Sequence, residues 1–138
     1  MPDDSDTTTP DTLLAAVPFA GELGLTLEEA TPARVVAGLA WSPRLCTAGG
    51  VLHGGALMTL ADTAGAVCAF LNLPPGAATS TVESSTHFFR PVRSGTAHAE
   101  ARPLHAGRSF VVVETEVRDE EGRAVGRTVQ TQAVLRGG

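Results

Sequence analysis

The sequence predicts an α+β fold in which one curved antiparallel sheet of six strands wraps around a single long central helix. Three observations support this prediction. An apolar run over residues 54–71 is long enough for about five helical turns at ~3.6 residues per turn. Two strand-like segments precede this run and four follow it. A helix that is apolar on nearly all sides must be covered, and the strands are the elements available to cover it.

The segments before the long helix are short and are punctuated by proline and glycine. They are a short helix at Asp11–Ala16, strands at Leu25–Ala30 and Arg34–Trp41, and a loop at Ser42–Leu52. Pro18 and Gly21 are expected to close the short helix. Thr31 and Pro32 separate the two strands, because proline has no backbone N–H to donate to a sheet.

The long helix is expected to run from about Gly54 to Leu71, where the prolines of Leu73–Gly76 end it. The later segments predict strands at Ala78–Arg90, Thr96–Pro103, Phe110–Val117 and Ala124–Leu135. Asp119–Gly122 predicts a hairpin turn between the last two strands. On the first of the four strands, strict alternation places one set of polar side chains on one face: Thr79, Thr81, Glu83, Ser85 and His87.

Length and composition indicate one domain of 138 residues. Residues 1–10 are acidic and proline-punctuated and are expected to form a disordered tail, which leaves residues 11–138 as the single domain. No Lys or Arg precedes Arg34, which is the wrong charge for a signal peptide. No apolar stretch reaches the length of a membrane span. A cytoplasmic protein without a membrane partner is therefore expected.

The charge distribution argues against a nucleic-acid partner. The net charge is −5, and four of the fifteen acidic residues lie within the first eleven residues. The body of the chain is therefore nearly neutral and has no basic footprint. Cys46 and Cys68 lie in unlike contexts and suggest no disulfide. The histidines at 53, 87, 98 and 105 have no ligand-like spacing, so neither a metal nor a cofactor is expected.

Asp62 is the only acidic or basic residue between Gly54 and Phe70. A carboxylate in so apolar a run is expensive to desolvate unless it is hydrogen-bonded. A lone Asp in a helix is usually an exposed surface residue, but its flanks here offer no polar face, which favours burial. The run opens with His53, Gly54 and Gly55, whose backbone N–H groups can face an anion at a helix N-terminus. These two features together suggest acyl chemistry.

The pattern over Gly50–Gly55, followed by Leu60–Asp62, resembles the hotdog-fold acyl-CoA thioesterases. The closest subgroup is the phenylacetate-degradation type, related to the 4-hydroxybenzoyl-CoA thioesterases. The resemblance covers about residues 13–136 and includes Phe88–Pro91 and Gly107–Ser109. It implies a hotdog fold, an acyl-CoA substrate and thioester hydrolysis.

The resemblance also assigns roles to individual residues. Asp62 matches the catalytic carboxylate, acting as a general base on water or as a nucleophile. Gly54 matches the residue whose N–H polarises the thioester carbonyl, and His53 shapes that site. Apart from the resemblance, the small size of Gly54 and Gly55 also admits a substrate. Thr81 matches a hydroxyl that holds the water, and Ser80 takes this role if the alignment shifts by one residue. Capping, close packing and strand propensity explain His53, the two glycines and Thr81 equally simply.

Further positions concern the rest of the substrate. Thr47 lies where the family usually has Asn or Gln to orient the thioester. Arg90, Arg108 and Ser109 are candidates for binding the CoA phosphates, because guanidinium groups suit phosphate geometry. Surface solvation is the simpler explanation of these three residues. The sequence leaves the acyl group open between small and medium groups, aromatic ones included.

The spacing of Gly54 and Asp62 predicts that the protein is an oligomer. On one continuous helix these residues lie about 12 Å apart, at ~1.5 Å per residue. A single thioester carbonyl cannot meet both groups at that distance, so one of them must come from another subunit of a homodimer or homotetramer. A different class of function is also open: a non-catalytic protein that binds or senses acyl-CoA, which the substitution at Thr47 makes plausible.

Overall fold

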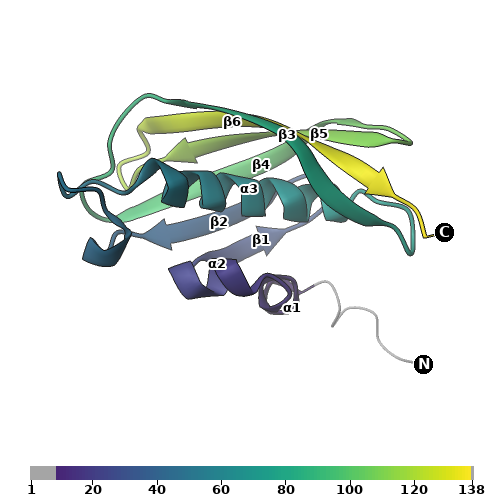
Figure 1. Cartoon of the computed structure of the whole chain (residues 1–138), viewed down its shortest axis with the longest axis horizontal. Coiled ribbons are helices and arrows are strands. Elements are labelled where there is room, and N and C mark those ends of the chain that lie inside the picture. Colours follow the sequence, from purple (N-terminus) through teal and green to yellow (C-terminus); the bar gives the residue numbers. More distant parts are fainter. Residues whose placement is uncertain (1–8, 138) are drawn as a thin grey trace.

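The structure is a computed structural model that describes residues 9–137. It contains helices α1 (Pro10–Ala15), α2 (Pro18–Leu23) and α3 (Gly54–Phe70), a short 3-10 turn η2 (Pro43–Leu45), and strands β1 (Thr26–Ala30), β2 (Val35–Ala40), β3 (Ala78–Phe88), β4 (Thr96–Ala106), β5 (Phe110–Arg118) and β6 (Ala124–Leu135). The six strands form one antiparallel sheet in the order β1-β2-β4-β5-β6-β3. The sheet curves around α3, which confirms the predicted α+β fold (Figure 1).

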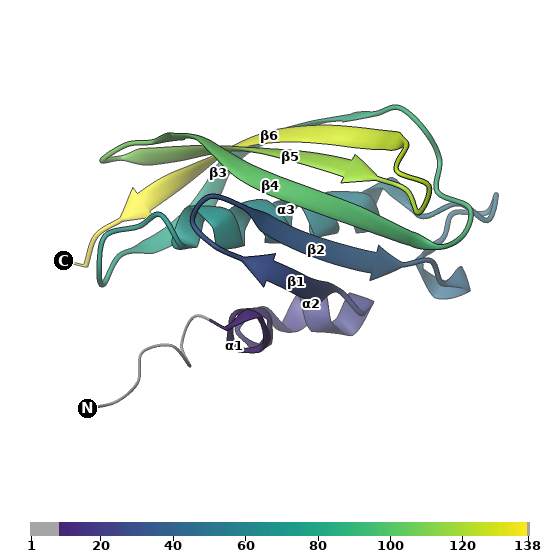
Figure 2. The ribbon, with the colours of Figure 1, turned by 180° about the vertical axis from the view of Figure 1, so that it is seen from behind.

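The inner face of the sheet is built to let α3 approach closely. Figure 2 shows the sheet from its outer side, with α3 behind it. Successive residues of β4 point to opposite faces, and the three alanines Ala97, Ala99 and Ala101 are fully buried on the inner face. Opposite them α3 buries Leu60 and Ala64. A buried leucine of this kind contributes about 1.5–3 kcal/mol relative to an exposed one.

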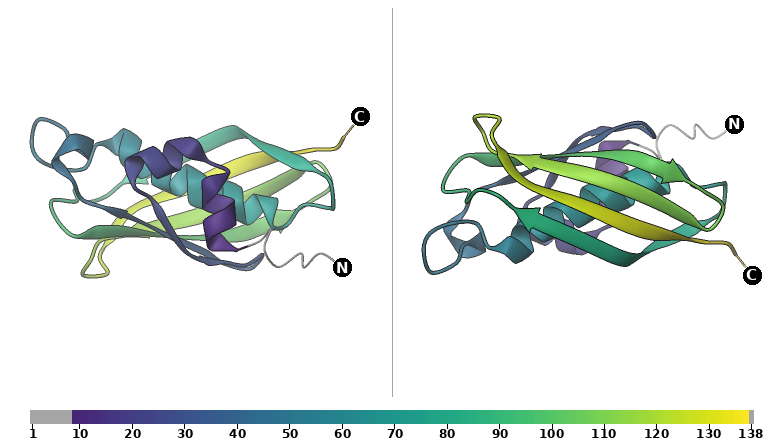
Figure 3. Two further views of the ribbon diagram at one scale, coloured as in Figure 1. Left: turned by 90° about the horizontal axis from the view of Figure 1, so that it is seen from below. Right: turned by 90° about the horizontal axis from the view of Figure 1, so that it is seen from above.

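The N-terminal segment forms two helices, not the single helix that the sequence predicts. Pro18 begins α2 instead of closing α1, because the missing N–H of proline costs nothing at the first helical position. Gly21 lies within α2, and Gly24, with a φ of 83°, ends it. Figure 3 (left) shows both helices crossing beneath α3, on the side that the sheet leaves open. Thr9 caps α1 at Pro10, and the rest of the predicted tail lies outside the described residues.

Strand β4 continues beyond Pro103, where the sequence predicts its end. The strand pairs with β2 only as far as Ala101, so no β2 carbonyl faces the nitrogen of Pro103. A bulge follows between Pro103 and His105, after which β4 pairs with β5 to its end. Proline is therefore tolerated because this part of β4 has lost its neighbour on one side.

A bulge at Val82 changes the faces of β3. Thr81 pairs with Gln132, whereas Glu83 pairs with Thr131, so Val82 is an extra residue. Thr86 consequently points inward, where its hydroxyl lies 2.8 Å from that of Thr128. The prediction that Glu83, Ser85 and His87 share a face with Thr81 is wrong, because strict alternation does not survive a bulge.

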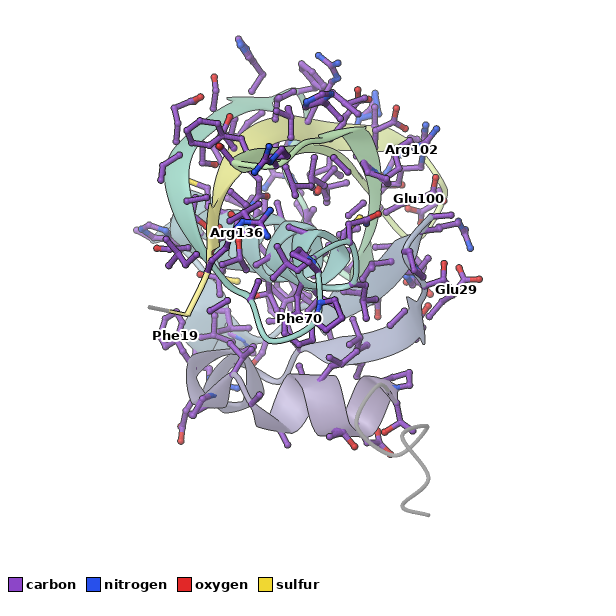
Figure 4. All side chains as sticks on the ribbon, turned by 90° about the vertical axis from the view of Figure 1, so that its right-hand side faces the viewer. Phe19, Glu29, Phe70, Glu100, Arg102 and Arg136 are labelled. Atoms are coloured by element: carbon purple, nitrogen blue, oxygen red, sulfur yellow. The ribbon has the colours of Figure 1, made fainter. Side chains whose placement is uncertain are left out.

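The outer face of the sheet carries charged pairs. Arg34 donates from Nε to Glu100 at 2.9 Å, and this hydrogen bond holds the pKa of Glu100 below its ordinary value. Arg127 likewise lowers the pKa of Glu114 through a hydrogen bond of 2.9 Å. Figure 4 shows Glu29, Glu100 and Arg102 along this outer side. Within residues 9–137, none of the helices combines the length and apolar character needed to cross a membrane.

Candidate active site

The first turn of α3 is arranged by His53, its N-cap residue. The Nδ1 atom of His53 accepts a hydrogen bond from the Gly55 N–H at 2.8 Å. The backbone carbonyl of His53 accepts hydrogen bonds from the N–H groups of Ala56 and Leu57, at 2.9 and 3.2 Å. Within the described chain the N–H of Gly54 makes no hydrogen bond. The positive end of the helix dipole thus leaves one donor for a ligand.

The two glycines of this turn have different steric roles. A Cβ on Gly55 would lie 3.0 Å from Nδ1 of His53, so a side chain there presses on the cap. A Cβ on Gly54 would lie 3.4 Å from the ring of Phe88, which is an ordinary contact. The glycine at 55 therefore leaves the His53 ring undisturbed, whereas position 54 has room for a methyl group.

Asp62 lies on an exposed stripe of α3, so the prediction that it is buried is wrong for the single chain. The residues of this stripe recur every three or four positions and are exposed or half-buried: Gly55, Met58, Thr59, Asp62, Ala66 and Phe70. Nearly all of these neighbours are small or apolar. The sequence therefore resembles that of a fully buried helix even though one stripe lacks a cover.

The two oxygens of the Asp62 carboxylate differ in their contacts, because two side chains hold one of them. Oδ1 accepts hydrogen bonds from Thr81 Oγ1 at 3.0 Å and from Gln130 Nε2 at 3.1 Å. Within residues 9–137, Oδ2 accepts no hydrogen bond and the carboxylate forms no ion pair. Ser80 lies on the opposite face of β3 from Thr81. Thr81 therefore supplies the hydroxyl beside Asp62, and both side-chain donors contact the same oxygen, Oδ1.

Gln130 is a contact of Asp62 that the sequence prediction missed. It is completely buried, as is Gln132 two residues further on β6. Glutamine is mostly exposed in proteins, so a glutamine on a strand predicts a position on the solvent face. A signal was nevertheless present: these are the only two glutamines of the chain, and they lie two apart on one strand face.

Gly54 and Asp62 are not brought together within one chain. The helix between them is unbroken, so they lie about 12 Å apart along its axis. Thr47 is exposed in the loop before α3, where its hydroxyl accepts from the Gly49 N–H at 3.4 Å. In the described chain no hydrogen bond joins Thr47 to the first turn of α3.

The candidate phosphate-binding residues lie at opposite ends of the sheet. Arg90 follows the Phe88 end of β3, in a polar pocket of about 330 Å³ that also contains Arg93 and Arg123. Ser109 lies at the Ala78 end, since its carbonyl accepts from the N–H of Val134 at 2.8 Å. The ten residue steps of β3 between these ends span about 33 Å. Arg90 and the Arg108–Ser109 pair therefore cannot serve the same phosphate in one chain.

An apolar groove of about 500 Å³ begins at Asp62 and follows α3 toward its C-terminal end. Its lining comes from α1, the segment after it, α3 and the start of β3, and includes Leu13, Val17, Asp62, Ala66, Phe70 and Thr79. Along the helix from Asp62 to Phe70 the groove extends about 12 Å. Apart from Asp62, its lining carries no charge.

Comparisons with known proteins agree with this geometry. Residues 49–125 match the thioesterase superfamily. Rv1847 of Mycobacterium tuberculosis is 33% identical over 121 residues, which are 86% of each chain. The proofreading thioesterase EntH of Klebsiella pneumoniae is 42% identical over 74 residues, 54% of each chain. The thioesterase HI1161 of Haemophilus influenzae superposes with a TM-score of 0.87 at 28% identity, over 93% of this chain and 91% of that one.

The matched region contains the first turn of α3, Asp62 and Thr81. The resemblance to the hotdog-fold thioesterases is thereby confirmed in fold and in family. The chain belongs to the thioesterase superfamily, a family of thioester hydrolases.

Proposed function

We propose that this protein hydrolyses an acyl-CoA thioester to the free acid and CoA, with Asp62 as general base or nucleophile. The carboxylate of Asp62 carries this proposal: two donors hold Oδ1, while Oδ2, at the end of an apolar groove, accepts no hydrogen bond from residues 9–137. A fixed carboxylate with one open oxygen suits proton abstraction from water or direct attack on a carbonyl carbon. The fold and family agree with hydrolysis.

The N–H of Gly54 supplies the second element of the reaction. It binds the carbonyl oxygen of the thioester and stabilises the negative charge that develops there. In one route Oδ2 of Asp62 takes a proton from water as the water oxygen attacks the carbonyl carbon. In the other route Oδ2 attacks the carbon, and water then hydrolyses the resulting anhydride. In both, the C–S bond breaks and its electron pair leaves on the CoA sulfur, which ends as the thiol.

Each active site takes its Gly54 and its Asp62 from different subunits. The distance of about 12 Å between them on one helix requires this arrangement if both act on one carbonyl. The exposed stripe of α3 supports it, since Met58 and Phe70 are each 44% exposed in the single chain. The protein is accordingly a homodimer, or a homotetramer composed of such dimers.

The groove at Asp62 accommodates the acyl group. Its length and its uncharged lining suit small or medium acyl groups, aromatic ones included. Arg90 and the Arg108–Ser109 pair lie too far apart to hold the same phosphate in one chain, so a phosphate that both bind would lie between two subunits. Guanidinium groups there would bind the CoA phosphates.

A panel of acyl-CoA esters, followed by release of the free thiol, tests the proposal. Straight-chain and aromatic acyl groups are compared for the wild type and Asp62→Asn. The variant is expected to lose about 100- to 10,000-fold in kcat, the usual contribution of a positioned base, with an unchanged Tm. Unchanged turnover in Asp62→Asn would remove Asp62 from the mechanism.

One observation favours a second function, non-catalytic binding of acyl-CoA. The hydroxyl of Thr47 is directed to Gly49, and no longer side chain stands at this position to orient a thioester. Tight binding of acyl-CoA esters without hydrolysis of any ester in the panel would establish this alternative and exclude the enzyme.

A further inference from the structure

Both glutamines of the chain are buried on the inner face of β6, beside Asp62. We propose that Gln130, fixed by Gln132 and given room by Gly65, is a positioning residue that holds Oδ1 of Asp62 and leaves Oδ2 to react. This inference rests on the proposed function of Asp62. It concerns residues that do not touch the substrate and act through the carboxylate.

The orientation of both amides follows from one backbone carbonyl. The hydroxyl of Thr79 donates its only proton to the carbonyl of Ala133 at 2.8 Å, so it can only accept from Gln132. Gln132 therefore turns Nε2 toward Thr79, at 3.2 Å, and Oε1 toward Gln130. A reversed amide at 132 would place its oxygen against the Thr79 oxygen, two acceptors facing each other.

The same logic carries on to the carboxylate. Because Oε1 of Gln132 is an acceptor, Gln130 must present Nε2 to it, at 2.9 Å. The second hydrogen of that Nε2 is then directed at Oδ1 of Asp62, at 3.1 Å. Thr81 lies within reach of both Oε1 of Gln132 and Oδ1 of Asp62. The hydroxyl has one proton, and we assign it to Asp62 because a charged carboxylate is a stronger acceptor than an amide oxygen.

Gly65 makes room for this arrangement. A Cβ at position 65 would lie 2.0 Å from Oε1 and 2.5 Å from Cδ of Gln130, so the amide occupies the space of a missing side chain. Gly65 lies inside α3, where glycine is less favourable than alanine. The requirement for glycine here is the close approach of the amide, which one methyl group would displace.

The amide of Gln130 makes hydrogen bonds through Nε2, toward Asp62 and Gln132, but not through its oxygen. In the described chain, Oε1 of Gln130 is buried and has no hydrogen-bond partner. A buried acceptor without a partner lowers stability, and an apolar side chain of similar shape would avoid that loss. A residue present only for packing would therefore gain from such a replacement, whereas a positioning residue would lose activity by it.

Two substitutions test the inference. Gln130→Met keeps the length and removes the amide. It is expected to lower kcat at least about tenfold, because a misplacement of ~1 Å near a reacting group can cost up to about 100-fold. KM is expected to stay within about threefold and Tm to be unchanged or higher. Gly65→Ala is expected to lower kcat similarly. In the background of the shorter Gln130→Val, the change at Gly65 is expected to have almost no further effect.

Gly21→Ala is the matched control, since Gly21 also lies in a helix and has nothing within 4 Å of an added Cβ. It should leave kcat unchanged. If Gly65→Ala lowers kcat equally with and without Gln130, Gly65 does not act through the amide and the inference is wrong.

A measurement that does not depend on activity completes the test. The chain has only three side-chain carboxamides, those of Gln130, Gln132 and Asn72, so their NMR signals separate easily. Asp62→Ala is expected to shift the Gln130 amide protons and to leave those of Asn72, which bonds to Pro32 and Cys68, in place. Equal shifts in both would contradict the inference. Full kcat in Gln130→Met with a loss in Asp62→Asn overturns the inference alone, whereas full activity in Asp62→Asn overturns the proposed function and the inference with it.

Discussion

The first turn of α3 is arranged by its immediate neighbours in the chain, whereas Asp62, about two turns further on, is arranged by distant strands. The cap at the first turn joins His53 to Gly55, two residues away. Asp62 is held by Thr81 and Gln130, which are 19 and 68 residues away. The first turn offers a backbone donor that only proline at position 54 would remove, while the carboxylate depends on several side chains. The two halves of the proposed site are therefore vulnerable to different changes.

After the loss expected for Asp62→Asn, the largest effect is expected from removing the backbone donor of the first turn. Gly54→Pro deletes the N–H at the first helical position, where proline is well tolerated. His53 already has the extended backbone, φ −60° and ψ 138°, that precedes a proline. The kcat should fall about 100- to 1,000-fold, the usual loss of one oxyanion donor. Gly54→Ala, which keeps the N–H, is the control. An equal loss in both variants would point to the Phe88 contact instead of the donor.

Mixing two inactive variants tests whether the two halves belong to different subunits. When Asp62→Asn and Gly54→Pro subunits exchange freely, half of the dimers are mixed, and one of the two sites in each mixed dimer is intact. Activity should therefore return to about one quarter of the wild-type value in a two-fold symmetric dimer. If subunit exchange is demonstrated by mass spectrometry and activity stays at the level of the single variants, shared sites are excluded.

The sequence predicts the residues of the first turn of α3 more fully than it predicts the side chains that surround Asp62. The cap residue, the two glycines and Asp62 lie within ten residues of one another on one helix, so their spacing alone places them. The bulge at Val82 and the burial of Gln130 depend on how β3 and β6 pair, which no local pattern records. The sequence predicts burial of Asp62 because its neighbours on the exposed stripe, Met58, Ala66 and Phe70, are apolar.

A smaller effect is expected when one of the two donors to Asp62 is removed. Thr81→Val keeps the shape of the side chain and removes the hydroxyl, while Gln130 still holds Oδ1. A hydrogen bond to a charged group contributes about 1.5–3 kcal/mol, so kcat should fall about 10- to 100-fold. Thr81→Ser keeps the donor and should retain most of the activity. Equal losses in the two variants would show that the methyl group of Thr81, and not its hydroxyl, matters.

The smallest effect concerns stability at the first turn and compares two helix glycines. Gly21→Ala should raise the free energy of unfolding by about 0.5–1 kcal/mol, the ordinary gain of alanine over glycine in a helix. Gly55→Ala should show little or none of this gain, because its Cβ lies 3.0 Å from Nδ1 of His53 and weakens a cap worth about 1 kcal/mol. Urea denaturation of both variants measures the difference. A full gain at Gly55 would mean that the His53 ring moves aside without a loss of stability. The first turn of α3 would then be held less tightly by its chain neighbours than Asp62 is held by β3 and β6.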